Sequence, residues 1–138
     1  MIPGIQAEVQ AAIAVHPRGD AVSVAAVNGP SSVVVSGVRD VVEEVVAGFV
    51  EGGVRVRRLR VSHAFHSPLM EPMLGEFRQV LDTLDFHAPS VDFVSAVGGG
   101  GDVGSVEYWV RHARAEVRFA DAVGELEGRG LTALVEIG

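Results

Sequence analysis

Apolar residues recur three and four positions apart in two stretches near the start of the chain. Residues 5–15, IQAEVQAAIAV, show this period, and residues 38–50 repeat it. Because that spacing puts the apolar side chains on one face of a helix, both stretches are predicted to be helices that pack against a core. Gly52 and Gly53 directly follow the second stretch and supply a C-terminal cap for that helix.

Between and after these helices the pattern changes to that of β-strands. Residues 21–27 and 32–36 are rich in β-branched residues and flank NGPS, in which Asn28 and Gly29 tolerate positive φ, so a hairpin is predicted. Residues 54–61, VRVRRLRV, alternate apolar and basic residues as a half-buried strand does. The order helix, strand, strand, helix, strand is that of a ferredoxin-like unit whose first strand is missing.

The rest of the chain alternates predicted helices and strands. Helices are expected over about 67–84, around 108–112 and over 120–128, and strands over 91–97 and 131–138. Such alternation is typical of a parallel sheet with helices packed on it. The predicted fold class is therefore α/β, with an incomplete ferredoxin-like α+β part before the parallel sheet.

Composition and charge exclude several classes of function. The 138 residues are 48% hydrophobic and 21% charged, as in a globular domain. The net charge of −7 argues against binding to nucleic acid or to an anionic membrane. The chain has no cysteine, a start that lacks the pattern of a signal peptide, and no stretch of the ~18 apolar residues that a membrane span needs. We therefore expect a cytoplasmic domain without a disulfide or a thiolate metal site.

Two histidines three residues apart, His63 and His66, lie where the two predicted parts, 1–61 and 62–138, meet. Three interpretations stay open for this pair. A metal site would need ligands in a known spacing, and neither HExxH nor a Cys/His pattern accompanies the pair. A structural histidine would cap the following helix or pack between the parts. A general base would lie in a cleft and would need a nucleophile.

The residues alone show no motif for a nucleophile or for a phosphate-binding site that would accompany a general base. The sequence contains no GxSxG nucleophile elbow, since Ser67 is followed by proline. The glycines at 98–101 match neither a phosphate-binding loop nor a dinucleotide fingerprint, so we expect a surface loop there. The cluster Arg55, Arg57, Arg58, Arg60 and Arg78 is interpreted either as a face for an acidic partner or as a solvated strand edge.

Four longer strings carry a family resemblance. VSVAAVNGPSSVVVSG, RRLRVSHAFHSPLMEPMLGEF, EYWVRHARAEVRFADAV and the closing LVEIG closely resemble the acyltransferase domain of modular type I polyketide synthases. The match is collinear over about 20–138, which is more specific than one short motif. The resemblance implies an α/β-hydrolase-like large subdomain with an inserted ferredoxin-like small subdomain.

The resemblance also implies a reaction and its partners. A serine would take the malonyl group of malonyl-CoA and pass it to the phosphopantetheine thiol of an acyl carrier protein, with no cofactor of its own and no metal. His66 matches the catalytic histidine, the last residue of the HAFH motif. His63, Ala64 and Phe65 match the three motif residues that accompany malonyl selection, and Phe65 would exclude an extra methyl group.

Two further residues take their expected roles from the same resemblance. His112 matches the position where the family uses a backbone carbonyl to hold the catalytic imidazole in the right tautomer. Asn28 matches the asparagine of the NGP turn near the cleft wall and is the weaker candidate for a substrate contact, because a positive-φ turn explains it equally well.

The chain departs from the family in having no GHSxG serine, no oxyanion-hole glutamine and no arginine for the malonyl carboxylate. We therefore expect it to supply the histidine but not the serine and to be inactive alone, with the N-terminal remainder of the acyltransferase domain and the neighbouring ketosynthase as partners. The alternatives are a non-catalytic remnant that docks an acyl carrier protein on its arginines, and a metal hydrolase built on His63 and His66.

Overall fold

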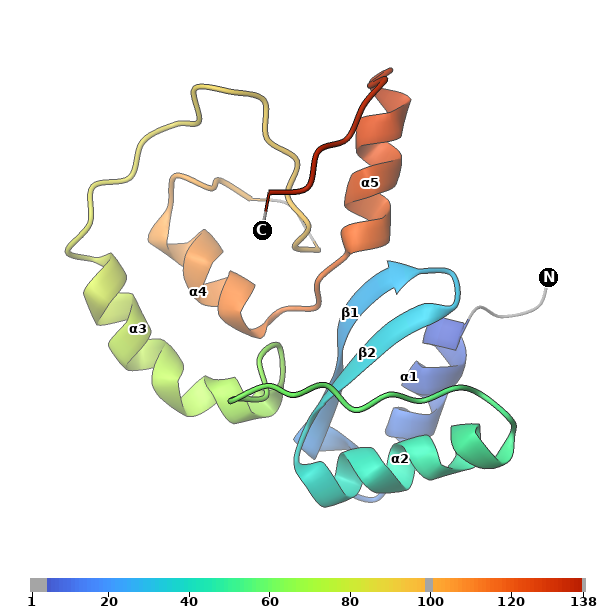
Figure 1. Ribbon diagram of the computed structural model, residues 1–138. Helices are drawn as coiled ribbons and strands as arrows, with labels where there is room; N and C mark the ends of the chain where they lie inside the picture. The colour runs from blue at the N-terminus through green and yellow to red at the C-terminus, as the bar shows by residue number, and fades with distance from the viewer. Residues whose placement is uncertain (1–4, 99–100, 138) are drawn as a thin grey trace.

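A two-stranded antiparallel hairpin lies at the centre of the fold (Figure 1). The computed structural model describes residues 5–98 and 101–137. Strand β1 (Val22–Gly29) pairs with strand β2 (Ser32–Gly37), which confirms the predicted hairpin. Asn28 lies inside β1, and the turn is formed by residues 30–31 instead. The expectation of a positive φ at Asn28 is wrong, because the ladder extends to the pair Gly29 and Ser32.

Helices α1 (Ile5–Val15) and α2 (Arg39–Glu51) pack against the hairpin and against each other, as predicted. Their apolar faces meet the strands in two clusters of buried valines. One cluster contains Val9, Val24 and Val27, and the other contains Val22, Val41 and Val45. Gly52 caps α2 by donating its N–H to the Gly48 carbonyl, and Gly53 follows with φ of 81°. The core of this half thus consists mostly of β-branched side chains, whose rotamers are restricted.

The turn between α1 and β1 is fastened to α2 by charged side chains. It contains the short 3-10 helix η1 (Gly19–Ala21). Arg18 donates to Asp40 at 2.7 Å, and His16 Nε2 lies 2.9 Å from Glu44. These contacts are exposed, so they add less to stability than the valine clusters beneath them.

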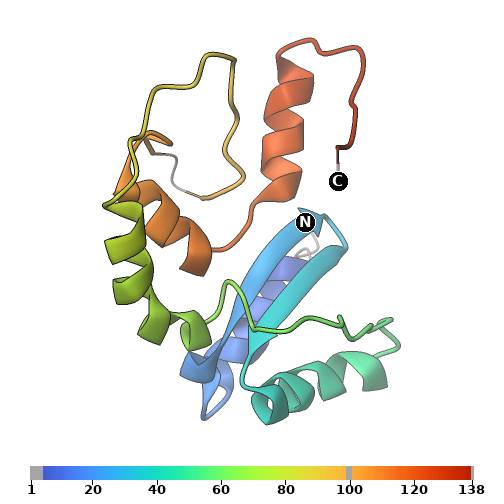
Figure 2. The same ribbon diagram turned by 60° about the vertical axis from the view of Figure 1, so that its left-hand side comes forward.

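The helix predicted over 67–84 is shorter and divided into two elements. It begins as the 3-10 helix η2 (Pro68–Met73) and continues as α3 (Leu74–Leu81). Pro72 lacks the N–H that an α-helix would use at that position, which accounts for the division. The two later helices are confirmed as α4 (Val106–Arg114) and α5 (Phe119–Gly128). Figure 2 shows α3, α4 and α5 on the side of the hairpin away from α2.

The segment between α4 and α5, residues 115–118, attaches the second half to the first. Val117 donates its N–H to the Ala25 carbonyl and accepts from the Val27 N–H, both at 2.8 Å, as a parallel bridge on the outer edge of β1. On its other side Val117 forms an antiparallel bridge with Val97. Within 5–98 and 101–137, this is all that forms of the predicted parallel sheet.

Three predicted strands are therefore wrong, although the mixed α/β class is confirmed. Residues 54–61 are extended and exposed, 91–97 contribute only the bridge at Val97, and 131–137 form no ladder; Gly138 lies outside the described residues. A strand needs a neighbour for its backbone N–H and C=O groups. In a ferredoxin-like unit the last strand lies beside the first, and no described residue supplies that first strand.

No helix in the described ranges has the length and apolar character needed to cross a membrane.

Replacement of Val41 by alanine tests the valine clusters. Val41 is 0% exposed, so we expect Val41→Ala to lower the free energy of unfolding by about 2 kcal/mol, measured by urea denaturation followed by circular dichroism. Val50→Ala is the matched control, because Val50 lies on the same helix but is 54% exposed. Equal losses in the two variants would contradict the assignment of the core.

Candidate active site

His66 occupies a left-handed backbone conformation at the loop between the two halves. Its φ is 58°, a value that residues with a Cβ rarely adopt. The Ser23 hydroxyl on β1 donates to the His66 carbonyl at 2.8 Å, and the His66 N–H donates to the Ala113 carbonyl of α4 at 3.3 Å. The backbone of the histidine is thus tied to β1 on one side and to α4 on the other.

The imidazole of His66 has one ring nitrogen fixed by a backbone carbonyl. Nδ1 lies 2.9 Å from the Ala115 oxygen. Because a carbonyl oxygen only accepts, this contact requires a proton on Nδ1 and leaves the lone pair of the neutral ring on Nε2. That is the state in which a histidine takes a proton from a nucleophile. The expectation that the carbonyl belongs to His112 is corrected: it belongs to Ala115, just past the C-terminus of α4.

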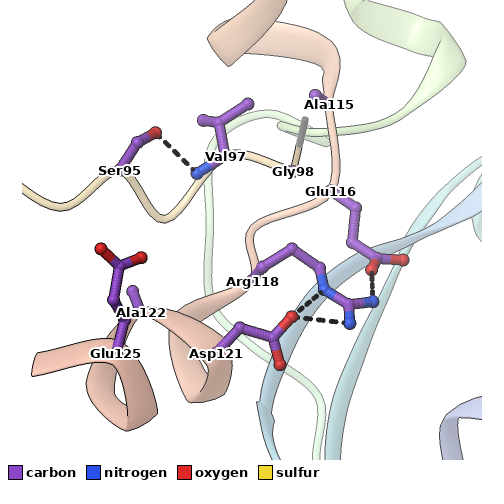
Figure 3. Close-up of a pocket in the computed structure, with 9 residues that line it drawn as sticks. All are labelled: Ser95, Val97, Gly98, Ala115, Glu116, Arg118, Asp121, Ala122 and Glu125. Carbon is purple, nitrogen blue, oxygen red and sulfur yellow. Dashed lines mark hydrogen bonds and ion pairs between the residues drawn. The ribbon is translucent and has the colours of Figure 1, made fainter. Parts of the chain in front are cut away.

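The position of the Ala115 carbonyl follows from the bonds of the segment that carries it. Val117 joins this segment to β1, and the Arg118 N–H donates to the Ala96 carbonyl. The Arg118 guanidinium binds Glu116 at 2.8 Å and Asp121 at 2.7 Å, and Figure 3 shows both carboxylates directed at it. These hydrogen bonds raise the pKa of Arg118 above its usual value. The segment is therefore held by its main chain and by a charged side-chain cluster.

Figure 3 draws the residues that line a hollow beside that cluster, which has a volume of about 600 Å³. Among the described residues that line it, the acidic ones are Glu116, Asp121 and Glu125, and the basic one is Arg118. Since two carboxylates already engage Arg118, this hollow is poorly suited to a substrate carboxylate. A second hollow of about 340 Å³ adjoins β1, and Ser23 is among the residues that line it.

His112 contributes a ring beside the imidazole of His66. The two ring centroids are 6.0 Å apart, and the His112 ring also lies 5.9 Å from Tyr108 and 5.8 Å from Trp109. Partial burial in this aromatic cluster, and after it the nearby charge of His66, lower the pKa of His112. The fold therefore favours neutral His112.

The other residues of the HAFH motif lie at the surface of the described part. His63 is exposed with Nδ1 3.0 Å from the Ser62 hydroxyl, and its ring is 6.1 Å from that of Phe65. Phe65 is 49% exposed, and Ala64 is half-buried. Asn28 is also exposed, but it lies five residues along β1 from Ser23, about 16 Å at the usual rise of a strand. The structure thus groups the motif residues with His66 and separates Asn28 from them.

Ser67, next to the histidine, is a structural residue. It is fully buried, its hydroxyl donates to the Ala64 carbonyl at 2.6 Å, and it accepts from the Leu69 N–H as the N-cap of η2. One interpretation of the histidine pair is that a histidine caps the following helix. The structure shows that Ser67 is this cap. In the described ranges, no three histidine or acidic residues come close enough together to hold a metal ion.

Sequence reasoning missed the three groups that hold His66, namely the Ser23 hydroxyl and the carbonyls of Ala113 and Ala115. The two carbonyls belong to alanines, which carry no side-chain chemistry to mark them. The available signal was the end of the helix predicted around 108–112, because the last carbonyls of a helix have no partner within it.

Comparison with known proteins gives a consistent result. The family model described as "Acyl transferase domain" matches residues 4–138. Polyketide synthase GfsA of Streptomyces halstedii is 50% identical over 139 aligned residues, which cover 96% of this chain and 2% of that protein. The chain therefore spans a small fraction of the length of such relatives.

Solved structures agree with this match. The acyltransferase domain from the second module of the salinomycin polyketide synthase is 52% identical with a TM-score of 0.84, over 92% of this chain and 30% of that one. A malonyl transacylase solved in complex with a type II polyketide synthase acyl carrier protein is 26% identical with a TM-score of 0.77, over 89% of this chain and 41% of that one.

The lowered pKa of His112 predicts a pH dependence of stability. The unfolded chain protonates this ring at about pH 6.5, whereas the folded chain does so only at lower pH, so the free energy of unfolding falls as the pH drops through this range. We expect His112→Gln to reduce that fall between about pH 7 and pH 5 in urea titrations. His87→Gln, at an exposed histidine, is the control. An unchanged slope in His112→Gln would contradict the prediction.

Proposed function

Because the chain belongs to the acyl transferase domain family, we propose that it is the histidine-bearing part of a polyketide synthase acyltransferase. In this proposal the complete domain moves a malonyl unit from malonyl-CoA to the phosphopantetheine thiol of an acyl carrier protein. The observation that carries it is the contact of 2.9 Å between His66 Nδ1 and the Ala115 oxygen, which leaves Nε2 as the proton acceptor.

The proposed chemistry is a two-step acyl transfer. The hydroxyl of a serine from the rest of the domain attacks the thioester carbon of malonyl-CoA, and His66 Nε2 takes its proton. The bond to sulfur breaks, and the leaving thiolate of coenzyme A recovers that proton. The carrier-protein thiol then gives its proton to Nε2 and attacks the malonyl ester, and the serine oxygen takes the proton back. No cofactor or metal enters this sequence of steps.

The 138 residues contain no GHSxG segment, so in this proposal the nucleophile comes from another segment of the domain. Ser67 is unsuited to replace it, because its hydroxyl is fully buried and already donates to the Ala64 carbonyl. The division into parts 1–61 and 62–138 belongs to the same proposal, and the bond from Ser23 to the His66 carbonyl joins the two parts.

The proposed partners follow from the relatives and from surface charge. A related transacylase was solved with an acyl carrier protein, which supports a carrier protein as the partner here. Arg55, Arg57 and Arg60 are exposed, and Arg58 lies 3.7 Å from Glu43. We propose that these arginines attract an acidic carrier-protein surface, while the remainder of the acyltransferase domain and a neighbouring ketosynthase complete the assembly. His112, whose ring centroid lies 6.0 Å from that of His66, stays a proposed member of the site, and Asn28 stays a proposed substrate contact.

Transfer of labelled malonyl from malonyl-CoA to an acyl carrier protein tests the proposed reaction. The chain alone is expected to transfer nothing, because it lacks the serine. Mixed with the remaining segment of a related domain, it is expected to restore transfer, and His66→Ala in the mixture is expected to lower the rate about 10²- to 10⁴-fold.

His87→Ala in the same mixture is the matched control and should retain the rate, because His87 is exposed and outside the proposed site. Transfer by the chain alone would overturn the assignment of the nucleophile. Transfer at the wild-type rate by the mixture that contains His66→Ala would overturn the assignment of the base.

The proposed malonyl preference is tested at Phe65. Replacing its phenyl ring by a hydroxyl group opens space for a substituent on the α-carbon of the substrate, so Phe65→Ser is expected to raise kcat/KM for methylmalonyl-CoA relative to malonyl-CoA by about tenfold or more. The comparison uses the complemented domain with both substrates. Phe93→Ser removes a similarly exposed ring outside the HAFH motif and should leave the ratio unchanged. A ratio that moves equally in both variants would contradict a specific role for Phe65.

A further inference from the structure

The left-handed backbone of His66 must be maintained by its surroundings. Among the non-glycine residues that the structure describes, His66 alone has a positive φ, 58°. Such a conformation crowds the Cβ against the backbone and persists where neighbouring contacts fix it. Strained residues of this kind concentrate at functional sites, so the contacts that hold His66 have a bearing on its chemistry.

Ser23 provides the side-chain hydrogen bond to this backbone. Its hydroxyl donates to the His66 carbonyl at 2.8 Å, a shorter contact than the 3.3 Å between the His66 N–H and the Ala113 carbonyl. Ser23 is itself well fixed, because Val22 and Val24 on either side of it are buried in the core. It also pairs with Ser36 across the hairpin. The hydroxyl is therefore presented from a rigid strand.

Strand β1 also fixes, through Val117, the Ala115 carbonyl that contacts the His66 ring. Ala25, two residues after Ser23, accepts the N–H of Val117, and this bond fixes the segment that carries the Ala115 carbonyl. The ring of His66 and its own carbonyl branch from one Cα, so a rotation of this backbone moves Nδ1 away from the Ala115 oxygen. One strand thus sets both ends of the contact between Nδ1 and that oxygen.

We propose that Ser23 is a positioning residue for His66, whose hydroxyl holds the strained backbone so that Nδ1–H meets the Ala115 carbonyl and Nε2 stays free to accept a proton. The effect on acyl transfer rests on the proposed function, whereas the effect on the tautomer does not. Ser23 itself takes no part in bond formation, because its proton is donated to the His66 carbonyl.

The first experiment measures the tautomer of His66 by ¹⁵N NMR of the imidazole in the full 138-residue chain at mildly alkaline pH. The wild type is expected to have a protonated Nδ1 and an unprotonated Nε2. Ser23→Ala is expected to produce a mixture of the two tautomers. Ser23→Thr, which keeps the hydroxyl, is expected to restore the wild-type pattern.

Ser36→Ala is the matched control, since it removes the same group from the residue that pairs with Ser23 in the hairpin. It is expected to keep the wild-type tautomer. A folded Ser23→Ala chain with the wild-type pattern would overturn the proposal. If Ser23→Ala does not fold, Ser23→Thr decides, because a folded threonine variant with mixed tautomers would also overturn it.

A second experiment measures acyl transfer in the complemented domain. Ser23→Ala is expected to lower kcat roughly three- to tenfold, the effect of about one net hydrogen bond, and to leave KM unchanged. Ser36→Ala should retain both constants. A rise in KM alone would contradict a role in orienting the base. An inactive wild-type mixture would instead contradict the proposed acyltransferase reaction, and the tautomer measurement would still decide the role of Ser23.

Discussion

Two hydrogen bonds between Val117 and strand β1 determine how the second half of the chain meets the first. The Val117 N–H binds the Ala25 carbonyl and the Val117 carbonyl accepts from Val27, each at 2.8 Å. Main-chain groups that leave water need such partners, so the register of residues 115–118 on β1 is strongly specified. The same two hydrogen bonds fix the end of α4 and the start of α5, which lie on either side of this segment. The carbonyl that holds His66 is fixed with them, two residues before Val117.

The part of the fold that depends on local pattern could be predicted from sequence. The apolar period of residues 5–15 and 38–50 and the β-rich runs around Asn28 each led to the observed element, because a helix or a two-stranded hairpin satisfies its backbone nearby. Residues 54–61 have an equally regular alternation, yet they form no strand. Pattern indicates which face of a strand would be buried, but a strand forms only beside a partner. That information lies in distant segments and not in the pattern of the strand itself.

The candidate site divides in the same way. His66 could be proposed from the sequence because the side chains around it form a distinctive string. The carbonyl that orients the His66 ring could not be identified from the sequence, because every residue has a carbonyl oxygen and only its position in the fold distinguishes this one. The resemblance suggested His112, whereas the contact is made by Ala115, three residues later. Three residues are almost one helical turn, so the end of α4 decides which carbonyl faces the imidazole.

In the proposed reaction, the orientation of the base is separate from the supply of the nucleophile. The 138 residues contain His66 with its left-handed backbone and both groups that hold it, the Ser23 hydroxyl and the Ala115 carbonyl. The tautomer needed for proton acceptance is therefore set by contacts that are complete here. By contrast, Val135 and Ile137 expose apolar side chains, at 81% and 93%, along a segment beside which the described residues place no strand. In the proposed assembly, the rest of the acyltransferase domain covers such surfaces and brings a serine to a base that is already oriented, so assembly does not have to reorganise the histidine.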